Sequence, residues 1–142
     1  MEQTEIKYQR KSYISIGEIY FWTATINEWK PLLQNEKFKN IIINSLQYLS
    51  DKGMIDVFAF VIMPNHIHLI WRINEMNGKE TVQGAFLKYT AHEFKKELRR
   101  QSLAHLQEFK VLVCNKQFEF WQRDPFVTLP KLGQGNNRLL LV

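Results

Sequence analysis

The chain has 142 residues, 45% of them apolar and 23% charged, a composition typical of one globular domain with its own core. Its net charge of +5 favours polyanionic partners such as nucleic acids, and its single cysteine excludes an internal disulfide and a cysteine-based zinc site. No apolar run is long enough to span a membrane and the N-terminal residues lack the apolar core of a signal peptide, so we expect a cytoplasmic protein without a membrane partner.

The first half of the chain predicts a strand, a helix and two further strands. Residues 19–26 are rich in β-branched and aromatic side chains, as strands are. Apolar residues recur at helical spacing in residues 36–53, and Gly53 stands where helices commonly end on glycine. Residues 54–63 form an apolar run that predicts a strand at the centre of its sheet, and residues 66–73 predict the next strand.

A tight turn joins these last two strands, because only Pro64 and Asn65 separate them. Proline presets the backbone of the first central turn position, and asparagine tolerates a positive φ at the second. An antiparallel hairpin follows, with His66 as the first residue of its returning strand.

The second half of the chain predicts a helix at residues 80–101, followed by one or two short strands at residues 109–114 and 118–122. The core face of this helix is an i, i+4 stripe of Val82, Phe86, Thr90, Phe94 and Leu98. The resulting order of elements predicts an α+β ferredoxin-like sandwich, an antiparallel sheet with two main helices on one face. We assign residues 1–125 to this single domain and residues 126–142 to an atypical C-terminal tail.

His66 and His68 are two residues apart on a predicted strand, so both side chains leave the same face of the sheet. Their backbones are then about 7 Å apart, and their ring nitrogens can converge on one cation, although imidazole alone does not select the metal. The alternative is a pair of hydrogen-bonded sheet residues. A histidine-triad nucleotide hydrolase is disfavoured, since position 70 is isoleucine.

The stretch FAFVIMPNHIHLIW resembles the signature hairpin of the HUH single-tyrosine transposases, a group that includes the REP-associated tyrosine transposases. HUH denotes histidine, a bulky apolar residue and histidine, here His66, Ile67 and His68. Three other stretches are similar to family segments: IYFWTATINEWKPLL, FLKYTAHEFKKEL and FWQRDP. The resemblance covers residues 19–125.

The resemblance implies a ferredoxin-like fold and a divalent metal, Mg²⁺ or Mn²⁺, held by His66 and His68. It also implies a tyrosine nucleophile that cleaves and rejoins single-stranded or hairpin DNA, the chemistry of DNA transposition. Tyrosine attack conserves the energy of the phosphodiester bond in a covalent intermediate. The expected partners are therefore single-stranded or hairpin DNA and a second copy of the chain in a homodimer.

The family tyrosine follows the histidines in sequence, and Tyr89 is the one tyrosine of this chain that does so. It stands at the border of the helical core stripe, with a packing role as the alternative. One turn later, Glu93 is a candidate third metal ligand, with an exposed helical glutamate as the alternative. The family tyrosine usually lies just after the tryptophan motif, where this chain has Asp124, Pro125 and Phe126. Two functions therefore stay open: cleavage by Tyr89, and a non-catalytic DNA-binding relic of a truncated transposase.

The helical stretch KYTAHEFKKELRR carries five basic and two acidic side chains, three of the five net charges of the chain. Lys88, Lys95 and Arg99 lie opposite the core stripe, and we expect them to contact phosphates; the alternative is an ordinary solvated face. Trp71 and Trp121 are aromatic residues that can stack on unpaired bases, with core packing as the alternative.

Overall fold

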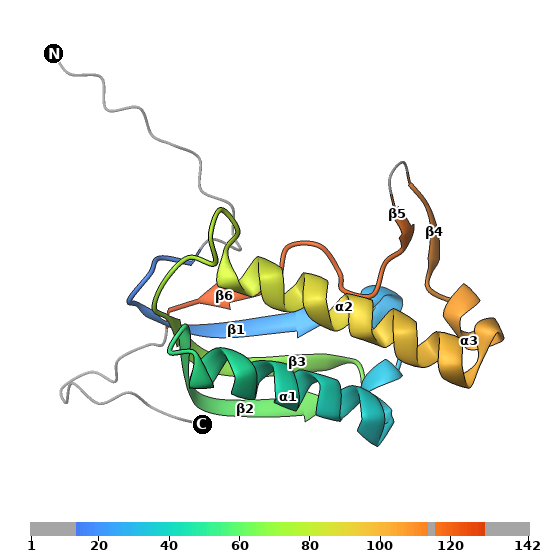
Figure 1. The fold of residues 1–142 in the computed structure, drawn as a ribbon, viewed down its shortest axis with the longest axis horizontal. Coiled ribbons are helices and arrows are strands. Elements are labelled where there is room, and N and C mark those ends of the chain that lie inside the picture. The colour runs from blue at the N-terminus through green and yellow to red at the C-terminus, as the bar shows by residue number, and fades with distance from the viewer. Residues whose placement is uncertain (1–13, 114–115, 130–142) are drawn as a thin grey trace, which may run out of the picture.

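A four-stranded antiparallel sheet with two helices on one face forms the centre of the protein, in a computed structural model that describes residues 14–113 and 116–129 (Figure 1). The strand order is β2-β3-β1-β6, and the strands are β1 (Ile19–Thr25), β2 (Ile55–Met63), β3 (His66–Ile73) and β6 (Phe126–Thr128). The two helices are α1 (Glu36–Asp51) and α2 (Val82–Gln101). The predicted α+β ferredoxin-like sandwich is confirmed. Within residues 14–113 and 116–129, no helix is long and apolar enough to cross a membrane.

Smaller elements connect this framework. Two short 3-10 helices, η1 (Asn27–Trp29) and η2 (Leu32–Gln34), join β1 to α1. After α2 come α3 (Leu103–Gln107) and a separate two-stranded hairpin of β4 (Lys110–Val113) and β5 (Lys116–Phe118). This hairpin projects from the end of the molecule near α3 rather than joining the main sheet (Figure 1).

Two strand predictions need correction. The strand after α2 that joins the main sheet is β6, since β4 and β5 pair only with each other. β6 pairs with β1 and begins just past the predicted domain boundary at residue 125, while the rest of the tail, residues 130–142, lies outside the described residues. β2 is an edge strand and not a central one, so several of its apolar side chains stay exposed, among them Phe60 and Val61.

The core lies between the sheet and the helices. Trp22 and Trp71, on neighbouring strands, are fully buried with ring centroids 4.9 Å apart, and Phe86 of α2 packs edge-on against both indoles. The buried residues of α2 are those of the predicted stripe: Val82, Phe86, Thr90, Phe94 and Leu98. Gly53 follows α1 with φ at 72°, the left-handed conformation expected of a glycine that ends a helix.

A buried polar contact ties the tryptophan motif to α2. The indole Nε1 of Trp121 donates a hydrogen bond of 2.9 Å to Thr90 Oγ1, and that hydroxyl donates to the carbonyl of Phe86, one turn earlier. Thr90 is fully buried, so this bond satisfies two polar groups that water does not reach. The motif FWQRDP therefore serves the packing of the helix in this structure.

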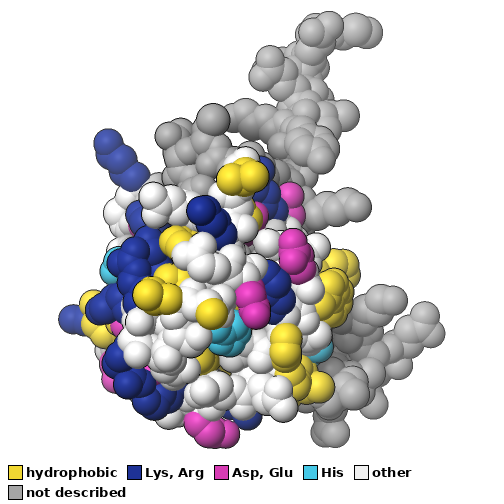
Figure 2. Space-filling view, turned by 90° about the vertical axis from the view of Figure 1, so that its right-hand side faces the viewer, with side chains coloured by type: hydrophobic (Ala, Val, Ile, Leu, Met, Phe, Trp, Pro, Cys, Tyr) yellow, Lys and Arg dark blue, Asp and Glu magenta, His cyan; other side chains and the backbone are white. Residues whose placement is uncertain are grey.

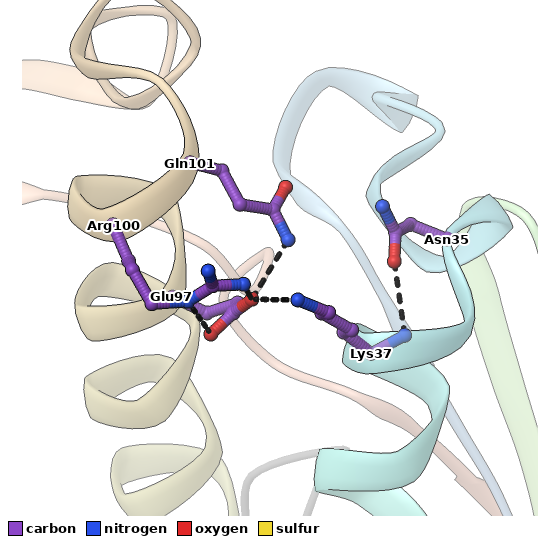
Figure 3. A network of polar contacts seen from close by, with 5 residues as sticks. All are labelled: Asn35, Lys37, Glu97, Arg100 and Gln101. Carbon is purple, nitrogen blue, oxygen red and sulfur yellow. Dashed lines mark hydrogen bonds and ion pairs between the residues drawn. The ribbon is translucent and has the colours of Figure 1, made fainter.

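Glu97 connects the C-terminal part of α2 to the start of α1 (Figure 3). Its carboxylate accepts hydrogen bonds from Arg100 and Gln101 and lies 3.5 Å from the Nζ of Lys37. The hydrogen bond from Arg100, followed by that from Gln101 and the nearby positive charges, lowers the pKa of Glu97 to about 2. Glu97 thus stays ionised at any moderately acidic pH.

This shift predicts a pH-dependent contribution to stability. Since the pKa of Glu97 in the folded state lies below its ordinary value, its contribution is complete above about pH 4.5 and is lost as the pH falls towards 2. Urea unfolding of the wild type and of Glu97→Gln should differ most at neutral pH and converge near pH 2. A difference that stays constant between pH 7 and pH 2 would contradict this role for the carboxylate.

Candidate metal and nucleic-acid site

His66 and His68 lie on the face of the sheet opposite to the helices. The alternate residues of β3 all belong to the buried core: Ile67, Leu69, Trp71 and Ile73. Side chains alternate along a strand, so the two histidines point to the other face, and both are half-buried there. Both histidines therefore share one face, as the sequence predicts. In the pairing of β3 with β1, Thr25 lies opposite His66 and Thr23 lies opposite His68.

The two imidazole rings turn their Nε2 atoms towards each other, 3.1 Å apart. The other ring nitrogen, Nδ1, has an oxygen neighbour in each case. Asn65 Oδ1 lies 2.6 Å from His66 Nδ1, and Thr23 Oγ1 lies 2.8 Å from His68 Nδ1. These oxygens orient the rings and, when each Nδ1 carries the proton, leave the Nε2 lone pairs free. Asn65 does not adopt the positive φ that its turn position permits, and the hydrogen bond to His66 accounts for the residue type instead.

The pair has the geometry of two ligands of one cation. Two nitrogens that each bind a metal at about 2.1 Å, at a right angle, are about 3 Å apart. Burial, and secondarily the charge of His66, lowers the pKa of His68 below its ordinary value. The neutral imidazole that binds metals is therefore favoured at His68. A hydrogen bond between two neutral imidazoles is the other arrangement that fits these coordinates.

The described residues supply no third ligand at this pair. They contain no group of three or more histidine, cysteine, aspartate or glutamate side chains that could hold a metal. Glu93 lies on α2, 3.3 Å from the Nζ of Lys96, and lines a groove between α1 and α2. The two histidines fit a divalent cation that takes its remaining ligands from water or from phosphate oxygens.

Tyr89 lies on the helix side, away from the histidine pair. Its side chain is 54% exposed and lines the groove between α1 and α2, a hollow of about 710 Å³. Tyr48 lines the same groove, and Tyr20 is buried with its hydroxyl accepting a hydrogen bond from the Ser15 backbone. Among the tyrosines of the described ranges, none faces His66, because the sheet lies between.

The predicted phosphate-binding residues also lie on the helix side. Lys88 is 3.1 Å from Glu80, Lys95 covers the ring of Phe118, and Arg99 is exposed. Figure 2, which views the end of the molecule that carries α3, shows lysine and arginine side chains gathered on the side of the helices. On the histidine face, Arg72 is paired with Asp56 at 2.8 Å. The structure thus separates the basic helix from the histidine pair.

Trp29 is an exposed aromatic residue beside the pair that the sequence analysis did not single out. Trp71 and Trp121 are buried and serve core packing, which rules out the base-stacking role considered for them. Trp29 is 61% exposed, and its ring lies edge-on to that of His66, with centroids 6.2 Å apart. A tryptophan in a short polar turn directly after a strand, NEWKP, was the available signal.

The fold and the histidine pair define an antiparallel α+β domain of ferredoxin-like topology, with a two-histidine site on the sheet face opposite to α1 and α2, here called the open sheet face. Among solved structures, the protein is similar to one described as a REP-associated tyrosine transposase bound to a REP hairpin. The TM-score is 0.51 at 18% sequence identity, and the match covers 86% of this chain. The family resemblance of the sequence is therefore confirmed at the level of the fold.

The match spans 60% of the length of that transposase, so the transposase has a substantial portion without a counterpart in the aligned region. No family model matches the chain, and no curated protein matches it.

Proposed function

We propose that the domain binds single-stranded or hairpin DNA on its open sheet face, with a divalent cation at His66 and His68. The observation that carries this proposal is the convergence of the two Nε2 atoms at 3.1 Å on the sheet face opposite to α1 and α2. The solved relative bound to a REP hairpin supports the choice of ligand. Of the two expected metals, Mn²⁺ suits the site better, because Mg²⁺ favours oxygen ligands and retains its water.

A cation at this position would neutralise charge on a DNA phosphate and polarise it. The residues of this chain contribute orientation. Thr23 and Asn65 hold the two rings by their Nδ1 atoms, which keeps the two Nε2 atoms close together. Ile67 and Leu69, buried on the other face of β3, anchor the strand that carries the rings.

The second candidate function is DNA strand cleavage and rejoining by metal-assisted tyrosine attack, as in transposition, with Tyr89 as nucleophile. The preformed histidine pair favours it, since a polarised phosphate is what such an attack requires. Because the sheet lies between Tyr89 and the pair of the same chain, Tyr89 would act on the pair of a second copy in a homodimer. If Tyr89 does not act, the protein is a binding relic of such an enzyme.

Cleavage by Tyr89 has a direct test. Incubation with Mn²⁺ and single-stranded DNA should produce a covalent protein–DNA adduct, which Tyr89→Phe eliminates without weakening DNA binding, because only the attacking oxygen is lost. Tyr48→Phe, in the same groove, is the matched control and should keep the adduct.

Mixing two inactive variants tests whether Tyr89 acts on the histidine pair of a second copy. Tyr89→Phe mixed with a His66→Ala/His68→Ala variant should recover adduct formation, since each protein supplies the group that the other lacks. Absence of any adduct with the wild type, at DNA concentrations that saturate binding, would leave the binding relic as the function.

The salt dependence of binding tests whether the basic helix contacts phosphates. DNA affinity should fall steeply with salt, since each single-strand phosphate contact contributes about 0.7 to the logarithmic slope. If the strand also contacts the basic helix, replacing Lys88, Lys95 and Arg99 together with glutamine should lower the slope by up to about 2. The same charge change on α1 and at the residue that follows it is the control: Lys37→Gln, Lys39→Gln and Lys52→Gln. Equal slopes for the two triple variants would assign the basic helix to an ordinary solvated face.

A further inference from the structure

We propose that Trp29 is a base-stacking residue that holds an unpaired nucleotide next to the histidine pair. This inference rests on the proposed function, because it concerns how a DNA strand on the open sheet face is positioned. Trp29 is 61% exposed, while Trp22, Trp71 and Trp121 are buried, so it is the one indole of the chain with a surface free for a ligand. Its ring centroid lies 6.2 Å from that of His66.

Hydrogen bonds fasten the turn that carries Trp29 to the residues around the site. The backbone N–H of Ile26 donates a hydrogen bond of 2.9 Å to the carbonyl of Asn65. The backbone N–H of Asn27 donates one of 2.8 Å to the carbonyl of Phe120. The first bond ties the turn to the residue that also orients His66. The indole and the imidazole pair are therefore positioned by the same few residues.

The backbone of this turn is strained in a way that core packing does not explain. Glu28 and Trp29 both have φ at 57°, the left-handed region that residues other than glycine rarely adopt. Neither side chain is buried, so no core contact is gained in exchange. Strain of this kind is concentrated at ligand-binding and catalytic sites, where the surrounding structure enforces a particular side-chain position.

The chemistry of the turn selects a base rather than a phosphate. Glu28 is exposed beside Trp29, and a carboxylate repels phosphate, while Lys30 is directed to Glu28 at 3.5 Å and to the ring of Phe109. An indole stacks on any base through its π-face, but a base inside a duplex already has both faces covered by its neighbours. The ligand of Trp29 is therefore an unpaired base of the strand whose phosphate meets the histidine pair.

The test measures binding of the full chain, with Mn²⁺, to a labelled single strand and to a blunt duplex of the same sequence. Trp29→Ala should weaken single-strand binding about 5- to 150-fold, the effect of losing one stacked base, and leave duplex binding unchanged. Trp29→Phe should restore most of the affinity. Alanine keeps a Cβ at the strained position, so Trp29→Ala removes the ring without relieving the backbone. The matched control is Tyr48→Ala, an equally exposed aromatic residue on α1, which should bind like the wild type.

A single abasic site moved along the strand identifies the stacked base. At one position the abasic strand should lose the same affinity as Trp29→Ala does, and the two changes together should cost no more than either alone. Wild-type fluorescence should be quenched by the strand, and that of Trp29→Phe should not. Unweakened single-strand binding by Trp29→Ala would overturn this inference alone. Failure of the wild type to bind single strands would overturn it together with the proposed function.

Discussion

Replacing His66 and His68 together with alanine should abolish the rise in melting temperature that Mn²⁺ produces in the wild type. A ligand that binds only the folded state stabilises it by mass action, by about 2.7 kcal/mol at one hundred times its dissociation constant. For a domain of this size, that corresponds to roughly 5–15 °C. The measurement is thermal unfolding with increasing Mn²⁺, followed by circular dichroism, with Mg²⁺ as a second series.

The chain offers a matched control for this experiment. Its other two histidines, His92 and His105, lie on α2 and α3, away from the open sheet face, so His92→Ala/His105→Ala makes the same chemical change elsewhere. This control should keep the full Mn²⁺-dependent rise. A rise that survives in His66→Ala/His68→Ala, or that disappears equally in both double variants, would remove the metal from the proposed function.

Phe86→Ala should lower the free energy of unfolding by about 3–5 kcal/mol, the largest stability effect that we expect from a single substitution. The ring of Phe86 is 1% exposed and packs edge-on against Trp22 and Trp71 at centroid distances of 6.0 and 6.2 Å. Removing it leaves a cavity between the helix and the strands, which neighbouring side chains fill only in part. Urea unfolding at neutral pH measures the loss.

Tyr89→Ala, less than one turn further along α2, is the control for Phe86→Ala. Its side chain is 54% exposed, so we expect a change within about 0.5 kcal/mol, typical of surface substitutions. Comparable losses for the two variants would mean that the face of α2 that packs on the sheet is not the one described. The comparison thus tests the orientation of the helix that separates Tyr89 from the histidine pair.

Local sequence patterns were sufficient for the two main helices, for the strands β1, β2 and β3, and for the histidine face. The i, i+4 stripe of α2 and the turn at Pro64 and Asn65 depend on residues close in the chain, whose backbone preferences and side-chain periodicity act within one element. His66 and His68 share a face for the same reason, since two residues apart on a strand is a local relation. The order of the predicted elements indicated the ferredoxin-like fold, and the likeness of the hairpin to the HUH transposases implied the same fold.

Only the tertiary structure decided which elements became neighbours. The sequence of β2 predicts a central strand because it is apolar on both faces. Strand order depends on pairing across the sheet, however, and β2 lies at the edge of the sheet. β6 is three residues long, too short to show a period, and is recognisable only by its pairing with β1. Trp29 stands beside His66 because contacts between distant residues hold its turn, and Tyr89 lies behind the sheet because the helix stripe packs there. Such relations arise from packing between segments far apart in the chain, which no local period records.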